Sequence, residues 1–349
     1  MYLNQFKIYT GNQLDIATLK FIRTDEKLAE MFYEDGFRYY LKDERGLLSI
    51  IKESLGDYLQ ELPLPVSDID TVFFISDNNY IPECGPNDYN HFIAFRNGLY
   101  NILAENKLNK AFPYIIGGAG CANLSNALRL ADGLLRSENI RNILVIIVDK
   151  FEDDNKRLMP LTQTNRIAAG SIGSDIAAGF ILSSRATGTA YLHIKNYWET
   201  AHTKMISSYY EMVRQGKQTN YMLETVKGLM HFKQSSGKIF QKGLNEYKTI
   251  YTGNYTKNYF KIYTQQFGWT PEKINMSSKE SIGHAQSLDS LIAISENKIT
   301  DEDSLIFLIG PCMWSVIEFN YSSLENQLTN EKKQSRHKRF SSGKSVQHC

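Results

Sequence analysis

The sequence lacks an excess of charge of either sign. Its 349 residues carry 39 Lys and Arg against 38 Asp and Glu, which gives a formal net charge of +1. Proteins that bind nucleic acid or an anionic membrane through their overall field are normally strongly basic. The near balance of charge therefore argues against nucleic acid and acidic membrane surfaces as general partners.

Long apolar runs are also missing. The N-terminal letters MYLNQFKIYTGNQ contain no apolar signal-peptide core, and no run reaches the about 20 residues that span a bilayer. We expect a soluble cytoplasmic protein without a membrane span. The chain is long enough for two domains, or for one large duplicated domain with a sizeable core.

Cysteines are few, and none is paired in a CxxC motif. The four are Cys84, Cys121, Cys312 and Cys349. Without such spacing the sequence predicts no zinc site and no other metal site. Without an export signal we expect reduced thiols. A free cysteine is most often a small buried hydrophobe, so a chemical role for any of them must rest on its surroundings.

Short apolar runs that alternate with helical patterns are the main feature of the chain. The runs have continuous rather than alternating apolar letters, which indicates strands covered on both faces. Predicted strands lie at 68–77, 112–118, 142–149, 177–184 and 190–198, with two more around the turn at Pro311. Predicted helices lie at 44–62, 123–137, 221–247, 257–268 and 285–296.

This order of elements predicts an α/β protein built from two halves of similar size. We expect an N-terminal half at 1–186, a C-terminal half at 187–324 and a tail at 325–349. The halves show no strong sequence repeat, but their element order is compatible with a structural duplication. The tail is polar and basic, a composition typical of disordered segments.

The letters YIIGGAGCANLSNALRLADGLL place Cys121 between a turn of small residues and a helix. Gly117, Gly118 and Gly120 permit a tight strand-to-helix turn, because glycine tolerates positive φ. The first N–H groups of a helix carry partial positive charge, which favours a thiolate and lowers the pKa of a thiol there. The pattern predicts a reactive, nucleophilic thiol at Cys121.

The same stretch, followed by NILVIIVD, resembles the ketoacyl synthase III group of the thiolase superfamily. The segments DIDTVFFISD, GSDIAAGFILSS and LIFLIGPCMWSVIEF resemble further parts of that family in the family's order. The resemblance spans about residues 60–321. It implies a thiolase-like fold, with two duplicated halves stacked in five layers, α-β-α-β-α. It also implies a dimer that transfers acyl groups through a thioester on Cys121.

The catalytic residues of the family match this sequence only in part. The family's histidine position falls on Gly253, and His284 in SIGHAQSLD stands where the family has asparagine. The glycine of the oxyanion hole falls on Pro311, which has no N–H, or on Gly310 after a shift of one residue. In the family that histidine and that asparagine stabilise an enolate. Because both are replaced in this sequence, we expect poor decarboxylation of malonyl thioesters.

Cys121 and His284 could still form a catalytic dyad. Each is expected to open a helix in its own half, and the pseudo-symmetry of the fold brings such helix starts together. A neutral imidazole could accept the thiol proton and later deprotonate an acceptor. The alternative is a His284 that bonds only to the backbone. Ser287 and Asp289 are expected to satisfy free helix N–H groups rather than to act as a third catalytic member.

The favoured function is an acyltransferase or condensing enzyme of specialised fatty acid or polyketide metabolism. The acyl group would reach Cys121 from acyl-CoA or an acyl carrier protein, with no permanently bound cofactor. The alternative is a degenerate synthase-like subunit that scaffolds an active paralogue without catalysis. Gly253 and Pro311 favour that alternative, whereas Cys121 and His284 oppose it. A cysteine hydrolase is a third possibility that no other motif supports. The partner would be a second copy or a paralogue.

Overall fold

The computed structural model of the chain describes residues 1–76, 89–137, 139–159, 170–187, 190–215, 221–240, 242–297 and 303–323. Its helices are α1 (Lys20–Arg23), α2 (Glu26–Glu34), α3 (Leu47–Glu61), α4 (Tyr89–Glu105), α5 (Asn123–Leu135), α6 (Thr203–Gln215), α7 (Tyr221–Ser236), α8 (Lys257–Phe267), α9 (Lys279–Ile282) and α10 (Asp289–Asn297). Two 3-10 turns matter for the site, η3 (Gly120–Ala122) and η8 (Gln286–Leu288).

The strands are β1 (Tyr2–Thr10), β2 (Asn12–Asp15), β3 (Tyr39–Lys42), β4 (Thr71–Ile75), β5 (Phe112–Ile116), β6 (Asn142–Asp149), β7 (Leu158–Met159), β8 (Ser171–Ile172), β9 (Ile176–Ser183), β10 (Ala190–Ala201), β11 (Thr249–Thr252), β12 (Ile274–Asn275), β13 (Ser304–Ile309) and β14 (Met313–Ser323). In the described part of the chain, ten of them form one sheet, in the order β12-β11-β13-β14-β10-β1-β9-β6-β4-β5.

The sheet consists of two copies of one arrangement. From the centre outwards the first half runs β1-β9-β6-β4-β5, and the second half runs β10-β14-β13-β11-β12. In each half the two innermost strands pair antiparallel with their neighbours, and the three outer strands are parallel to one another. The halves join where Tyr2–Asn4 of β1 pairs with Tyr191–His193 of β10. The expected structural duplication is therefore confirmed.

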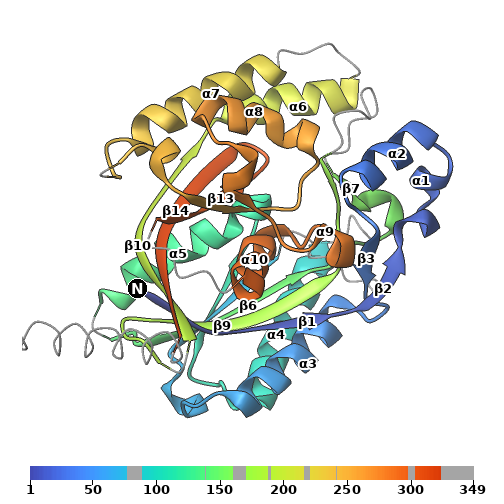
Figure 1. Cartoon of the computed structure of the whole chain (residues 1–349). Helices are drawn as coiled ribbons and strands as arrows, with labels where there is room; N and C mark the ends of the chain where they lie inside the picture. The colour runs from blue at the N-terminus through green and yellow to red at the C-terminus, as the bar shows by residue number, and fades with distance from the viewer. Residues whose placement is uncertain are drawn as a thin grey trace, which may run out of the picture.

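Helices and sheets stack in five layers (Figure 1). Helices α3 and α4 cover the outer face of the first half, and α7 and α8 cover the outer face of the second. Helices α5 and α10 lie side by side between the halves and share one apolar core with both. The α/β, thiolase-like α-β-α-β-α architecture predicted from the sequence is confirmed.

Strand β6 shows why the predicted strands have continuous apolar letters. Its residues Ile143, Val145 and Ile147 pack into the middle core, together with α5 and α10. The intervening residues, Leu144, Ile146 and Val148, pack into the outer core with α3 and α4. Successive side chains of a strand point to opposite faces, so a strand with helices on both faces needs apolar residues at every position.

Several elements differ from the sequence prediction. Strand β1 was not predicted, yet it lies at the centre of the sheet between β9 and β10. Its letters YLNQFKIYT mix polar and apolar residues, and its pairing with β9 is interrupted between Asn4 and Lys7. Helix α4 was not predicted either. The predicted helix at 221–247 ends at Ser236, and the chain then turns.

Residues 10–42 form a cap with a small core of its own. The hairpin β2–β3 and helices α1 and α2 bury Ile16, Leu28 and Phe32, which pack against Leu158 and Ile172 beside the main sheet. The cap projects from one side of the molecule in Figure 1. The N-terminal region is thus a packed subdomain.

Among the described residues, no helix combines the length and the apolarity needed to cross a bilayer. Within the same ranges, no group of histidine, cysteine and carboxylate side chains is arranged to hold a metal ion. The described free cysteines are Cys121 and Cys312. Cys84, Cys349 and the predicted tail at 325–349 lie outside the described residues.

Candidate active site

Cys121 lies in the short turn that joins β5 to α5. Gly118 and Gly120 have φ values of 83° and 56°, a left-handed conformation that favours glycine. The turn is held by a hydrogen bond of 3.0 Å from the N–H of Ala119 to Oδ1 of Asn123. Cys121 occupies the 3-10 turn η3, immediately before α5, and is only 6% exposed. The predicted glycine turn and helix start are therefore present.

His284 is held by backbone contacts with the first half of the chain. Its N–H donates to the carbonyl of Ile172 at 2.8 Å, and its carbonyl accepts from the N–H of Ser174 at 2.9 Å. The sequence predicts that His284 opens a helix, but α10 begins five residues later, at Asp289. The intervening Gln286 has a φ of 52°, which an α-helix cannot contain. His284 instead lies two residues before the turn η8, whereas Cys121 lies within the turn η3.

The structure brings Cys121 and His284 together across 163 residues of sequence. Sγ of Cys121 lies 3.1 Å from Nε2 of His284. On the opposite side of the ring, Nδ1 of His284 contacts Oδ2 of Asp289. A carboxylate can only accept, so the proton of this contact belongs to Nδ1, which leaves Nε2 facing the sulfur. His284 and Asp289 are fully buried.

Asp289 also accepts two backbone hydrogen bonds. The N–H of Ala285 donates to Oδ1, and the N–H of Asn254 donates to Oδ2, each at 2.7 Å. Asp289 therefore accepts free N–H groups near a helix start, as expected. Its contact with His284 was not predicted. The local signal for that contact was the spacing of five residues between His and Asp in HAQSLD.

The charge of the site favours a protonated imidazole. Burial alone would lower the pKa of His284, but the Asp289 carboxylate and the Cys121 thiol outweigh it, and the pKa is raised well above its usual value. An imidazolium beside a sulfur favours the thiolate, the form of cysteine that acts as a nucleophile. The arrangement can therefore place a charged imidazole beside the buried sulfur.

Two further polar side chains surround the sulfur and were not predicted. Oε1 of Gln286 lies 3.2 Å from Sγ of Cys121, within the reach of a thiol hydrogen bond. The hydroxyl of Tyr255 is also hydrogen-bonded to the Cys121 side chain. The ring centroid of Tyr255 lies 5.0 Å from that of His284. Gln286 lies in the SIGHAQSLD segment but was not singled out, and Tyr255 belongs to no recognisable motif, so the tertiary structure reveals the role of both positions.

The predicted oxyanion turn between β13 and β14 lies beside the cysteine. A Cβ atom added to Gly310 would lie 2.3 Å from the carbonyl oxygen of Ala119, so only glycine permits this close approach. The N–H of Gly310, however, donates to the carbonyl of Met313 at 2.7 Å. Pro311 has no N–H and is exposed. In this geometry the two positions supply no free backbone donor.

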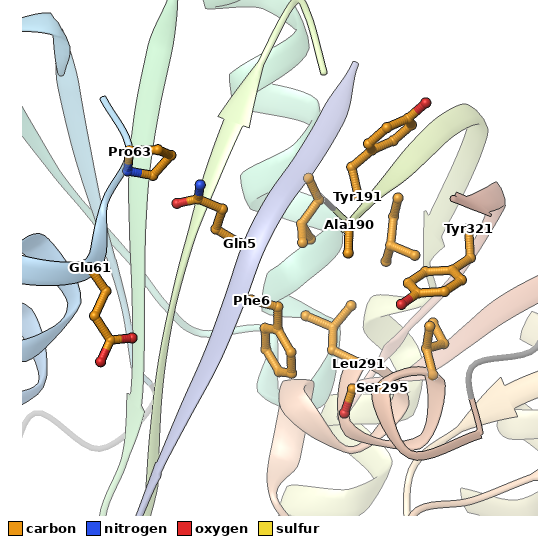
Figure 2. A pocket seen from close by; sticks show the side chains of 12 residues that line it. Gln5, Phe6, Glu61, Pro63, Ala190, Tyr191, Leu291, Ser295 and Tyr321 are labelled. Carbon is orange, nitrogen blue, oxygen red and sulfur yellow. The ribbon is translucent and has the colours of Figure 1, made fainter. Parts of the chain in front are cut away.

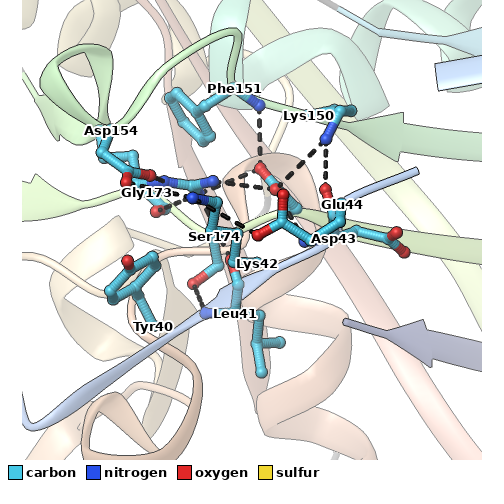
Figure 3. A network of polar contacts seen from close by, with 12 residues as sticks. Tyr40, Leu41, Lys42, Asp43, Glu44, Lys150, Phe151, Asp154, Gly173 and Ser174 are labelled. Atoms are coloured by element: carbon cyan, nitrogen blue, oxygen red, sulfur yellow. Dashed lines mark hydrogen bonds and ion pairs between the residues drawn. The ribbon is translucent and has the colours of Figure 1, made fainter. Parts of the chain in front are cut away.

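A buried network of polar contacts includes Ser174, whose N–H binds the His284 carbonyl (Figure 3 shows the network around Ser174). Arg157 donates to both carboxylate oxygens of Asp175 at 3.0 and 2.9 Å, and both side chains are almost completely buried. Asp175 accepts the N–H of Asp43, which directly follows the cap, and Ser174 Oγ accepts the N–H of Leu41 in the cap. Since Ser174 also donates its N–H to His284, the network connects the cap to the histidine.

A separate cavity of about 430 Å³ opens where the two halves join (Figure 2). Its wall includes Leu3, Phe6, Leu192, Leu291 and Tyr321. Neither Cys121 nor His284 is among the residues that line it. The cavity is therefore distinct from the cysteine site, even though Leu291 belongs to the same helix as Asp289.

The duplicated halves and the stacking of the layers define a thiolase-like fold, and the predicted resemblance to ketoacyl synthase III is confirmed at the level of that fold. The acyltransferase ChlB3 superposes with a TM-score of 0.67 at 14% identity, covering 92% of this chain and 98% of that one. The 3-oxoacyl-[acyl-carrier-protein] synthase III of Aquifex aeolicus superposes with a TM-score of 0.62 at 15% identity, over 91% and 99%.

A third similar structure is cerulenin-bound OleA of Xanthomonas campestris. Its TM-score is 0.67 at 12% identity, and the match covers 92% of this chain and 99% of that chain. No protein-family model and no curated protein sequence matches this chain. The similarity therefore concerns the fold, and any activity must be argued from the chain's own residues.

Proposed function

We propose that this protein is an acyltransferase that carries an acyl group as a thioester on Cys121. One observation carries the proposal: the buried chain of contacts from Cys121 Sγ through His284 to Asp289. A nucleophile, a base and a group that orients the base are the three parts that nucleophilic catalysis requires. Gln286 and Tyr255 complete the polar surroundings of the sulfur.

Loading begins with the transfer of the thiol proton from Sγ of Cys121 to Nε2 of His284. The thiolate then attacks the carbonyl carbon of an acyl thioester, and the carbonyl π electrons move to the oxygen. When the tetrahedral intermediate collapses, the bond to the donor sulfur breaks, and His284 returns the proton to that leaving thiolate. The protein is left as an S-acyl enzyme with a neutral imidazole.

Transfer uses the same base. Neutral His284 removes a proton from an acceptor hydroxyl or amine as the acceptor attacks the acyl carbonyl, and the proton then returns to the departing Cys121 sulfur. A base beside the sulfur suits a neutral oxygen or nitrogen nucleophile. Decarboxylative formation of a carbanion receives less support, because Gly253 has no side chain to help stabilise an enolate.

The donor is proposed to be acyl-CoA or an acyl carrier protein thioester, with no permanently bound cofactor. The names of the similar structures support this choice, since one is a 3-oxoacyl-[acyl-carrier-protein] synthase III and another is an OleA structure with lauric acid and lauroyl-CoA bound. The metabolic setting is proposed to be specialised fatty acid or polyketide synthesis.

We also propose that the protein is a dimer, with itself or with a paralogue. Strand β5 ends the sheet, so one of its edges is unpaired among the described strands, and its first residue, Phe112, is 62% exposed. A long apolar edge is normally covered by another chain or blocked. Within each protomer, the half at 1–186 would supply Cys121, and the half at 187–324 would supply His284.

The alternative is a synthase-like subunit that scaffolds an active paralogue. The occupied N–H of Gly310 and the absence of a side chain at Gly253 favour it. The buried contacts of His284 with Cys121 and Asp289 oppose it, because burying such groups is costly and has no evident use in a passive scaffold.

Intact-protein mass spectrometry tests the proposal. The protein is incubated with acetyl-CoA and with lauroyl-CoA, and the adduct is mapped by digestion; we expect it on Cys121, with Cys312→Ser as the matched control that still loads. His284→Ala should slow transfer to an added acceptor by about 10²–10⁴-fold, so that acyl-enzyme accumulates. An adduct confined to other cysteines, or no adduct at all, would refute the acyltransferase and favour the scaffold.

A further inference from the structure

Tyr255 fills the space that a side chain at Gly253 would otherwise enter. A Cβ atom added to Gly253 would lie 2.7 and 2.9 Å from carbons of the Tyr255 ring and 3.0 Å from its hydroxyl oxygen. Real Cβ atoms do not approach ring carbons this closely, so the glycine and the tyrosine are interdependent. The ring is 5% exposed, and it stands beside the His284 ring.

The hydroxyl of Tyr255 is aimed at the reacting atom. It is hydrogen-bonded to the Cys121 side chain. Burial, with a further contribution from Cys121, raises the pKa of Tyr255 well above its usual value. The phenol therefore keeps its proton and remains a hydrogen-bond donor throughout the working pH range.

Acyl transfer at Cys121 needs donors for the oxygen that becomes negative in each tetrahedral intermediate. The first turn of a helix leaves N–H groups without acceptors inside the helix, so the N–H of Cys121 can supply one. The turn between β13 and β14 does not supply a second, because the N–H of Gly310 is bonded to Met313 and Pro311 has none.

We propose that the Tyr255 hydroxyl is the second oxyanion donor. This role rests on the proposed function and adds a catalytic residue to it. As Cys121 attacks, the carbonyl π electrons move to oxygen, and the Tyr255 O–H shifts its hydrogen bond from the sulfur to that oxygen without giving up its proton. When the intermediate collapses, the bond relaxes, so the tyrosine is unchanged after each cycle.

The test compares two reagents that attack the same thiol. p-Nitrophenyl acetate acylates Cys121 through an oxyanion, whereas iodoacetamide alkylates it by direct displacement and forms none. Tyr255→Phe keeps the ring and removes the hydroxyl. Loss of one oxyanion donor typically costs about 10²–10³-fold in rate. We expect acylation to fall by about 10²-fold relative to alkylation, which corrects for any change in thiolate content.

The matched control is Tyr263→Phe. Tyr263 is also buried, and its hydroxyl bonds to Tyr259 rather than to Cys121. We expect it to leave the ratio of the two rates unchanged. Gly253→Ala is a second variant, which should displace the Tyr255 ring and lower the same ratio while keeping the hydroxyl. In wild type, the infrared carbonyl band of a ¹³C-labelled acetyl-enzyme should lie at lower wavenumber than in Tyr255→Phe.

The outcomes separate this role from the proposed function. A wild-type protein that forms no adduct on Cys121 refutes the acyltransferase, and the role of Tyr255 with it. A wild-type protein that loads, with an unchanged rate ratio and carbonyl band in Tyr255→Phe, overturns only the tyrosine's role. A lowered ratio in Tyr255→Phe and an unchanged ratio in Tyr263→Phe support it.

Discussion

Asp289→Asn is the most informative single change at the site, because it preserves shape and removes one charge. The carboxylate accepts from Nδ1 of His284 and from the N–H groups of Ala285 and Asn254. An amide has a single acceptor oxygen. If that oxygen faces Ala285, the NH₂ group meets both Asn254 and His284, and the imidazole must move its proton to Nε2. If it faces Asn254 and His284, the NH₂ group meets the N–H of Ala285.

Either orientation leaves a buried donor without its acceptor, which costs about 1–3 kcal/mol of unfolding free energy. The first also gives the wrong imidazole tautomer, with a proton facing the sulfur. In the Ser-His-Asp triad the equivalent change lowers turnover by about 10⁴-fold for this reason. We expect acyl transfer to fall by about 10²–10⁴-fold.

The pH dependence of Cys121 alkylation should change in Asp289→Asn only if Asp289 sets the charge of His284, and not if Asp289 is purely structural. The Asp289 charge opposes the effect of burial on His284, so in Asp289→Asn the pKa of His284 should fall. The imidazolium beside the sulfur should then be lost near neutral pH. Iodoacetamide alkylation of Cys121 at pH 7 should therefore be slower than in wild type.

Stability should follow the same protonation. His284 has a folded-state pKa above its unfolded value, so its contribution is complete below about pH 6.5 and is lost as pH rises through the folded pKa. The difference in unfolding free energy between wild type and Asp289→Asn should therefore be largest at low pH and should decrease as pH rises.

Ser290→Ala is the control for that experiment. Ser290 follows Asp289 on α10, and its buried hydroxyl has no hydrogen-bond partner among the described residues. We expect its alkylation profile and its urea midpoint to match wild type. An Asp289→Asn protein with the wild-type alkylation profile at every pH would show that Asp289 does not tune His284, and the reasoning above would fail.

Three further predictions concern stability, reaction type and assembly. Arg157→Met removes the guanidinium that donates to both oxygens of the buried Asp175 carboxylate and leaves Lys150, at 3.8 Å, as its remaining cation, so we expect a loss of about 3 kcal/mol in denaturant unfolding, the lower end of the cost of breaking a buried ion pair; a loss below about 1 kcal/mol would contradict the importance of the Arg157 pairing. Malonyl-CoA should release little carbon dioxide without an acyl donor, since Gly253 offers no side chain for an enolate; robust release would contradict the alignment of Gly253 and His284 with the family's sites. Sedimentation should show a dimer at micromolar concentration, because the edge strand β5 exposes Phe112, and a stable monomer would refute this.

Local physics explains what the sequence alone determined about this protein. Continuous apolar letters identify strands with helices on both faces, because the side chains on each face of such a strand pack into a core, as in β6. Glycines before a helix identify the turn at Cys121, because Gly118 and Gly120 adopt positive φ. Both signals depend on neighbours in the chain, and together with the resemblance they were sufficient to predict the α/β class, the duplication and the candidate nucleophile.

The remaining features depend on contacts that form only in the folded chain. Strand β1 reads as a mixed polar segment, and it becomes central only because β9 and β10 pair with its two edges. Asp289 looks like a residue that satisfies helix N–H groups, and the fold alone turns its carboxylate towards His284. Tyr255 reaches the sulfur because Gly253 leaves room for its ring. Tertiary packing, which brings buried polar groups to their hydrogen-bond partners, therefore decided which residues form the site.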